Sequence, residues 1–251
     1  MVFDNSVADE VINNLDNWLS KKIEGFGPVA HMPFLSRIIR NERDISSYSK
    51  THSISTTIGQ SVYEQISVII ARSNSDEAEH QTGVPTLISE DRRTVIRRIT
   101  DELKNKTQQP NRQSEIERIL EVPNQNMINS TPSPKKYDVF IRRGEEKYFF
   151  DLKTVKPNIG GFVKFKEQML EWIAREDYPI HSMMVFPYNP YFPQPFETAY
   201  QIGNIVNPDE YMVGEQYWDF IGGEGAYEQI LDIFDQVGEA HWGELNELIN
   251  G

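Results

Sequence analysis

Hydrophobic residues recur at helical spacing in the first half of the chain and at strand spacing in its middle. Apolar positions every three or four residues between Ser6 and Gly25 predict an amphipathic helix that ends before the glycine. The same spacing predicts further helices near residues 34–41, 61–71, 89–104 and 114–121. Gly59 and Ser61 are expected to act as breaker and N-cap of the third of these five helices. Polar stretches at 105–113 and 123–135 predict loops, the second being also a candidate mobile arm near DNA.

A hairpin is predicted over residues 136–153. In the first strand Tyr137 and Val139 alternate with Asp138, so a period of two places Asp138 on the opposite face from them. In the second strand Asp151 and Lys153 share one face, because successive side chains on a strand point to opposite sides.

The register of this hairpin decides which side chains meet. If residues 143–146 form the loop, Arg142 pairs with Lys147 and Asp138 lies opposite Asp151. Directly opposed side chains have Cβ atoms about 4.5–5.5 Å apart, and two carboxylates at that range repel unless a positive charge lies between them. A hard cation such as Mg²⁺ suits this pair, since it binds through one or two carboxylates and a substrate phosphate.

The elements after the hairpin complete a recognisable order. Apolar spacing predicts a helix over residues 162–173, and residues 181–186 read as a buried strand. A helix, two strands, a helix and a further strand indicate an α/β (α+β mixed) fold.

The residues Asp138 and Asp151-Leu152-Lys153 resemble the motif of the PD-(D/E)xK nuclease superfamily. Tyr137 stands where proline is usual, and Asp151 stands where glutamate is commoner. The resemblance implies a restriction-endonuclease-like core with a central mixed sheet, flanking helices and a helical N-terminal region. It also implies Mg²⁺-dependent hydrolysis of phosphodiester bonds, with Asp138 and Asp151 as metal ligands and Lys153 positioning water. The alternative for the motif alone is a surface hairpin with a charged edge.

The C-terminal half is similar to the TdeIII-like group of type II restriction endonucleases. The runs that carry this similarity are 151–158, 164–172, 187–191 and 217–223. The resemblance implies cleavage of duplex DNA at a short specific sequence, with 5′-phosphate and 3′-hydroxyl ends. It also implies a cognate DNA methyltransferase that protects the host.

A third acid is expected on the first helix of such a core. Glu64 lies off the apolar stripe of the helix at 61–71, and the resemblance gives it the role of a further metal ligand or a residue that orients water. A solvated helix face is the alternative. Glu115 and Glu117 compete for the role, but Ser114 with Glu117 reads as a capping box.

Charge is distributed unevenly along the 251 residues. The net charge of −13 opposes binding to phosphates, yet residues 176–251 contain 14 acidic and no Lys or Arg side chains, leaving 25 basic and 24 acidic side chains before them. Around the motif, residues 135–166 carry nine basic and four acidic side chains. Candidate DNA contacts in and after the motif are Arg142, Lys156, Asn158, Lys164, Lys166 and Gln168. For the helix-start residues among them, solvation is the alternative, and the loop at 187–192 is expected to be structural rather than DNA-facing.

The composition sets the remaining expectations. The sequence has no cysteine, no histidine spacing typical of zinc sites and no apolar run long enough to span a membrane, so we expect a cytoplasmic protein whose metal is held by oxygen. One nuclease domain is expected, with a helical extension (1–54), a catalytic core (55–190) and an acidic C-terminal subregion (191–251). Cleavage of a palindromic duplex favours a homodimer. A nuclease without sequence specificity, for example in repair or mobile-element processing, and a non-catalytic DNA-binding protein remain as alternatives.

Overall fold

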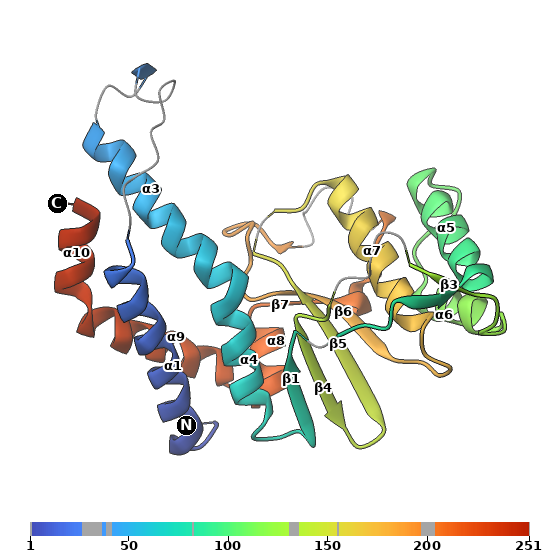
Figure 1. Ribbon diagram of the computed structural model, residues 1–251, viewed down its shortest axis with the longest axis horizontal. Coiled ribbons are helices and arrows are strands. Elements are labelled where there is room, and N and C mark those ends of the chain that lie inside the picture. The colour runs from blue at the N-terminus through green and yellow to red at the C-terminus, as the bar shows by residue number, and fades with distance from the viewer. Residues whose placement is uncertain are drawn as a thin grey trace.

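A five-stranded mixed sheet forms the centre of the molecule (Figure 1), in the strand order β1-β4-β5-β6-β7. The computed structural model describes residues 2–26, 37–38, 42–81, 83–130, 136–154, 156–196 and 204–250. The strands are β1 (Glu77–His80), β4 (Val139–Arg143), β5 (Glu146–Leu152), β6 (His181–Phe186) and β7 (Tyr211–Val213). β1, β4 and β5 pair antiparallel, whereas β6 and β7 continue the sheet in parallel. The mixed α/β fold is therefore confirmed.

The hairpin of β4 and β5 has the predicted register. Arg142 pairs with Lys147, and Val139 pairs with Phe150, so the next step along both strands brings Asp138 and Asp151 together. Gly144 in the turn adopts a φ of 59°, a left-handed conformation that favours glycine. β6 has the predicted bounds, and α7 (Ile159–Ile173) provides the crossover between β5 and β6.

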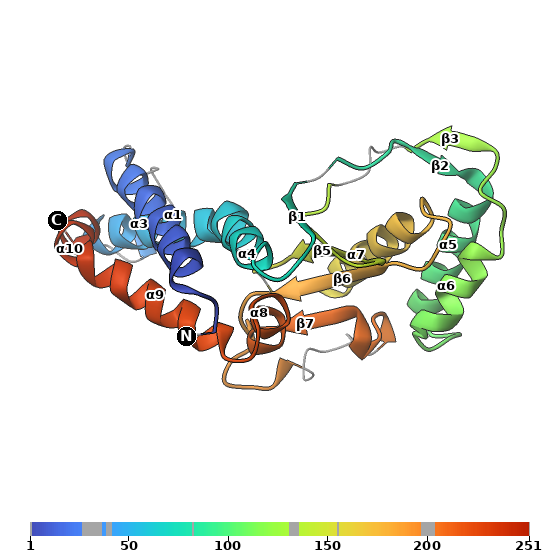
Figure 2. The ribbon, with the colours of Figure 1, turned by 90° about the horizontal axis from the view of Figure 1, so that it is seen from below.

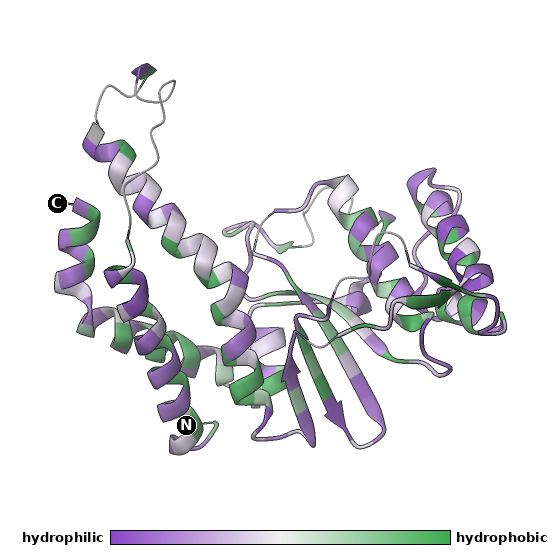
Figure 3. Cartoon of the chain, viewed as in Figure 1, coloured by the Kyte–Doolittle hydropathy of each residue, from purple (hydrophilic) through white to green (hydrophobic). Residues whose placement is uncertain are grey.

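Helices cover both faces of the sheet (Figure 2), and a hydrophobic core lies between the sheet and the helices on each face. On one face lie α1 (Asn5–Glu24), α4 (Tyr63–Ala71), α8 (Glu215–Gly222) and α9 (Ala226–Ala240). On the other lie α5 (Glu90–Lys104), α6 (Arg112–Leu120) and α7. Successive residues of β5 alternate between the cores, since Phe149 packs in the second and Phe150 in the first. Figure 3 shows that α1, α5 and α9 carry both hydrophobic and hydrophilic residues, as expected of helices with one buried side.

A long helical path leads into the core at α4. α3 (Glu42–Thr57) continues through a π-helical turn (Ile58–Val62) directly into α4, and α10 (Trp242–Asn250) packs against α3. The predicted break at Gly59 and cap at Ser61 are therefore wrong: the Ser61 hydroxyl donates back to the Thr57 carbonyl (3.2 Å) inside the helix. Gly59 serves a close approach instead, because a Cβ there would lie 2.6 Å from Thr154 Oγ1. The glycine in the π turn thus lets this helix pack closely against Thr154, the residue after Lys153.

A second, two-stranded sheet lies beside α5. β2 (Leu87–Ser89) pairs with β3 (Met127–Asn129), so the stretch predicted as a loop at 123–135 contains a strand. Ser89 caps α5 by accepting a hydrogen bond from the Arg92 N–H. A short 3-10 helix, η4 (Pro208–Glu210), precedes β7.

Two predictions concern the ends of the described ranges. Most of the helix predicted at 34–41 lies outside the described residues. Within the described part of the chain, no helix combines the length and apolar character needed to cross a membrane.

Candidate active site

Asp138 directly precedes β4, at a point where side chains do not alternate regularly between the two faces of the sheet. Tyr137 was predicted to share a face with Val139, but it packs in the opposite core, stacked on Phe149 (4.1 Å between ring centroids) and edge-on to Trp172 (4.9 Å). The Asp138 N–H donates to the Phe150 carbonyl (3.0 Å). The stabilisation from burying the Tyr137 ring among aromatic residues is therefore greater than the preference for regular alternation just before β4. Tyr137 and Val139 therefore face opposite cores, although a regular strand would place them on one face.

Asp151 and Lys153 project together from the end of β5, as predicted. Lys153 Nζ lies 2.5 Å from Asp151 Oδ1, and the Lys153 backbone N–H donates to the Val185 carbonyl of β6 (2.7 Å). Asp151 is only 2% exposed. The lysine side chain runs past the Phe165 ring, with Nζ 5.0 Å from its centroid. Packing on α7 and pairing with β6 therefore hold this acid and this amine beside each other.

Asp138 lies against the same motif from the neighbouring strand. Its Oδ2 accepts a hydrogen bond from the Leu152 N–H (2.7 Å) and lies 4.0 Å from Lys153 Nζ. Burial, followed by repulsion from Asp151, raises the pKa of Asp138 to about 7, while Lys153 opposes the rise. Such a perturbed carboxyl beside a second acid is typical of functional sites.

Glu64 joins this group from α4, two residues beyond the π turn. Its side chain is 8% exposed, which excludes the solvated helix face. Its carboxylate repels Asp138 and contributes to the raised pKa of that residue. His80 Nε2 lies 2.7 Å from Glu64 Oε2, and Gln81 Nε2 donates to the same oxygen (3.1 Å).

The acids fit a divalent cation through two carboxylates rather than three. Among the described residues, no group of three His, Asp or Glu side chains has the spacing of a metal site. Asp151 Oδ2, however, is buried and makes no hydrogen bond in the described structure. A buried carboxylate oxygen without a donor is costly, and a cation shared with Asp138 would satisfy it. This donor set matches Mg²⁺, which commonly keeps several waters and few protein ligands.

Tyr217 lies close enough to Asp138 and Glu64 to interact with their charges. This residue of α8 is fully buried, and burial together with the nearby Asp138 and Glu64 carboxylates raises the pKa of its hydroxyl. No sequence pattern connects Tyr217 with the acids, because the contact between α4 and α8 joins segments that are far apart along the chain.

Three of the predicted DNA-contact residues lie on the surface that follows the motif. Lys156, Asn158 and Lys164 are exposed. Lys156 Nζ lies 5.3 Å from the centroid of the Tyr191 ring. Asn158 also caps α7, since its side chain accepts a bond from the Gly161 N–H (2.9 Å).

Lys166 is placed elsewhere, and the prediction that it contacts DNA is wrong. It is 0% exposed and ion-paired with Glu115 and with Glu210, whose two carboxylate oxygens each lie 2.6 Å from Nζ. Burial raises the pKa of Glu210, while Lys166 opposes the rise. Lys166 thus connects α7, α6 and η4 in the core.

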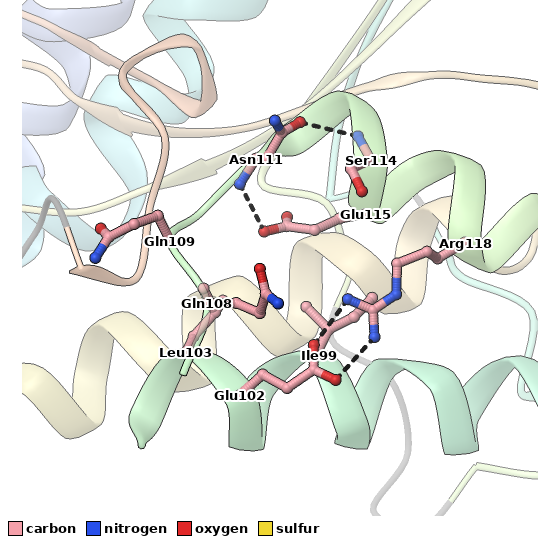
Figure 4. A pocket seen from close by; sticks show the side chains of 9 residues that line it. All are labelled: Ile99, Glu102, Leu103, Gln108, Gln109, Asn111, Ser114, Glu115 and Arg118. Atoms are coloured by element: carbon pink, nitrogen blue, oxygen red, sulfur yellow. Dashed lines mark hydrogen bonds and ion pairs between the residues drawn. The ribbon is translucent and has the colours of Figure 1, made fainter. Parts of the chain in front are cut away.

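The same arrangement removes Glu115 from the competition for the third acid. Glu115 Oε1 accepts a bond from the Asn111 N–H (3.1 Å), and the Asn111 side chain accepts from the Ser114 N–H (3.0 Å), in the pocket of Figure 4. The predicted capping box required Ser114 to cap α6, and this prediction is wrong. The capping residue is Asn111. The Glu117 side chain accepts instead from Gln113 on the same helix (2.7 Å).

The other two predicted DNA contacts, Gln168 and Arg142, are less accessible to DNA than the exposed lysines after the motif. Gln168 is half-buried, and its Nε2 makes no hydrogen bond in the described structure. Arg142 is paired with Glu77 (3.0 Å) and Asp76 (3.5 Å) at the turn end of β4. Arg142 lies four positions along the chain from Asp138, roughly 13 Å away in an extended strand.

The loop after β6 touches the end of the motif strand. The Tyr188 hydroxyl donates to the Thr154 carbonyl (2.9 Å), and the Asn189 side chain bonds within the loop, to Gln194 and Tyr191. These bonds support the structural role expected for Asn189. Phe192 is nevertheless 82% exposed at the loop.

The chain is similar in sequence to a family of restriction enzymes and to several of its relatives. The model of the family "Type II restriction endonuclease, HinfI" matches residues 3–238. Type II restriction enzyme MjaII from Methanocaldococcus jannaschii is 25% identical over 215 residues, 79% of this chain and 57% of that enzyme. Two enzymes from Herpetosiphon aurantiacus also match: HgiCII is 24% identical over 116 residues (44% of this chain, 42% of that one), and HgiEI is 22% identical over 205 residues (78% and 73%).

These matches extend well beyond the C-terminal half that carried the resemblance in the sequence. The chain matches a little more than half the length of MjaII. None of the solved structures matches it significantly. The resemblance to type II restriction endonucleases is confirmed, with HinfI as the matching family where the sequence runs indicated the TdeIII-like group. The chain belongs to the HinfI family of type II restriction endonucleases.

Proposed function

We propose that this protein cleaves duplex DNA at a short specific sequence, with Mg²⁺, leaving 5′-phosphate and 3′-hydroxyl ends. The observation that carries the proposal is the position of Lys153 Nζ, 2.5 Å from Asp151 Oδ1 and 4.0 Å from Asp138 Oδ2. Two carboxylates and one amine at the end of a hairpin suit phosphodiester hydrolysis, in which negative charge must be offset on a phosphate. Membership of the HinfI family supports DNA as the substrate.

Asp138 and Asp151 are the residues that would hold the metal, with Glu64 assisting. Bound there, Mg²⁺ would offset the charge of the two carboxylates and of the scissile phosphate. Asp138 is held in position by the Leu152 N–H, and Asp151 by burial beside β6. Protein groups that are fixed before substrate arrives pay little reorganisation cost during the reaction.

Lys153 is the residue proposed to position the attacking water. Its ammonium has three donors, of which Asp151 and the Leu152 carbonyl (3.1 Å) take two. The third donor can hold a water or a phosphate oxygen at the mouth of the site. The Lys153 side chain is 15% exposed, so it is mostly packed but still open to substrate.

Lys156, Asn158 and Lys164 are proposed to contact DNA beside the acids. They are exposed on the segment that follows the motif and on the first turns of α7, and two of them are cationic. Lysines neutralise phosphates, whereas the amide of Asn158 can also bond to base edges. Gln168 and Arg142 remain weaker proposals, because one is half-buried and the other is ion-paired.

A homodimer is proposed as the cleaving species. Two active sites related by a twofold axis match the symmetry of a palindromic duplex, so each copy would cut one strand. A cognate methyltransferase that protects the same sequence is the expected functional partner. These proposals follow from the symmetry of the substrate and from the family.

Incubation of the purified protein with long duplex DNA of known sequence, with Mg²⁺ or with EDTA, tests the function. Discrete fragments that require the metal are expected. A smear would indicate a nuclease without sequence specificity, and retention of intact DNA with metal-independent binding would indicate a DNA-binding protein.

A further inference from the structure

The end of β1 connects two of the acids through a single residue. The Gln81 backbone N–H donates to the Asp138 carbonyl (3.1 Å), while the Gln81 side chain donates to Glu64 Oε2 (3.1 Å). Gln81 has a φ of 49°, in the left-handed region that side-chain-bearing residues rarely adopt. An uncommon backbone conformation that serves two bonds to the same group of acids indicates a functional constraint.

His80 makes the second bond to the same acid. It pairs with Val139, the residue after Asp138, and its Nε2 lies 2.7 Å from Glu64 Oε2. A carboxylate only accepts hydrogen bonds, so this ring nitrogen must carry the hydrogen. Both bonds therefore converge on Oε2, and neither uses Oε1 of Glu64.

We infer that His80 and Gln81 are positioning residues that hold Glu64 against Asp138, with Glu64 Oε1 turned to the reacting groups. This inference rests on the proposed function. A glutamate has three rotatable side-chain bonds, and two donors on one oxygen restrict it to one orientation. Strand β1 thereby belongs to the catalytic machinery, although neither residue would touch the substrate phosphate. Residues that orient a ligand in this way typically change metal affinity or activity by about 10–100-fold.

The test compares variants that remove the two donors with one that keeps a donor. His80→Phe with Gln81→Met removes both bonds at similar side-chain volume, whereas His80→Gln retains an N–H near the Nε2 position. Gln81→Gly removes the amide and accepts the left-handed backbone, so it separates the bond from the strain. Ser75→Ala is the control, since it removes a bond to Arg143 (3.1 Å) just before the opposite end of β1.

Three quantities are measured for each variant of the full chain: the single-turnover cleavage rate, duplex affinity in EDTA, and the Mg²⁺ concentration that half-maximally raises the melting temperature. For the double variant and for Gln81→Gly we expect cleavage about 10–100-fold slower and a higher Mg²⁺ requirement, with unchanged DNA affinity. His80→Gln should retain most of the rate, and Ser75→Ala all of it.

Two outcomes overturn the inference in different ways. If the wild type cleaves DNA and the double variant cleaves within twofold of it, His80 and Gln81 do not position Glu64, while the proposed function stands. If the wild type cleaves no DNA at all, the proposed function fails and the inference fails with it.

Discussion

Asp138 Oδ2 accepts a 2.7 Å hydrogen bond from the backbone N–H of Leu152, the residue between Asp151 and Lys153. The bond joins the two strands through a side chain at the point where the regular ladder ends. It also holds Asp138 beside the Asp151-Leu152-Lys153 motif. The cost is a buried carboxyl close to Asp151, which is why the pKa of Asp138 is raised.

We predict that Asp138→Asn stabilises the metal-free protein and abolishes cleavage. Asn keeps an oxygen to accept the Leu152 N–H but removes the charge that Asp151 repels. Because the folded-state pKa is raised from 3.8 to about 7, the folded protein holds a proton that the unfolded chain releases across this window. The wild type therefore loses stability relative to the variant as pH rises from 4 to 7, by about 1–4 kcal/mol at pH 8.

Denaturant unfolding at pH 4 and pH 8, with and without Mg²⁺, measures this difference. Mg²⁺ should stabilise the wild type and leave the variant unchanged. Equal stability of the two proteins at both pH values would contradict the raised pKa, and equal stabilisation by Mg²⁺ would remove Asp138 from the metal site.

Lys166→Met should lower the free energy of unfolding by about 3–5 kcal/mol, because it leaves Glu115 and Glu210 buried without their cation. The loss should grow as pH rises, since the two acids must then ionise without compensation. Urea unfolding measures it. Lys164→Met on the same helix is the control and should change stability by less than about 0.5 kcal/mol, because Lys164 is exposed. An equally small loss for Lys166 would contradict a structural role.

Lys164→Ala and Lys156→Ala should each weaken duplex binding without altering the fold. A lysine that contacts one phosphate contributes about one unit to the slope of log affinity against log salt concentration. Fluorescence anisotropy in EDTA at several salt concentrations gives this slope. Lys21→Ala, exposed on α1, serves as the control. The proposed DNA surface is wrong if Lys164→Ala and Lys156→Ala both keep the wild-type slope, as Lys21→Ala should.

The cleaving species should contain two copies of the chain on one duplex. Sedimentation velocity of the protein with a cognate duplex and EDTA measures the stoichiometry. A single copy per duplex, at concentrations that give double-strand cleavage with Mg²⁺, would contradict the homodimer.

The hairpin could be predicted from the sequence because its register depends on local patterning. The loop length set Arg142 opposite Lys147, and the alternation in β5 placed Asp151 beside Lys153, both as observed. The break at Tyr137 could not be predicted in this way, since it depends on an aromatic cluster that includes Trp172 from a helix later in the chain.

Long-range packing explains the other differences. The sequence around Lys166 is that of an exposed basic residue. Its burial is favourable because Glu115 on α6 and Glu210 beyond β6 both pair with it. The π turn before α4 brings Gly59 close to Thr154, an approach across the fold that a side chain at position 59 would obstruct. The hydrogen bonds from His80 and Gln81 to Glu64 connect a helix and a strand end, and no pattern in the sequence relates these two segments. A histidine and a glutamine at the end of a short strand do not by themselves indicate that they bond to a glutamate on a helix.

The most direct test of the proposed site is single-turnover cleavage of a cognate duplex by Lys153→Ala, alongside its DNA affinity in EDTA. Lys153 holds Asp151 and faces Asp138, so its loss should reduce cleavage by at least about 10³-fold while binding changes less than about threefold. Lys156→Ala, three residues along the chain, is the matched control and should mainly weaken binding. A Lys153→Ala protein that cleaves at the wild-type rate would contradict the account.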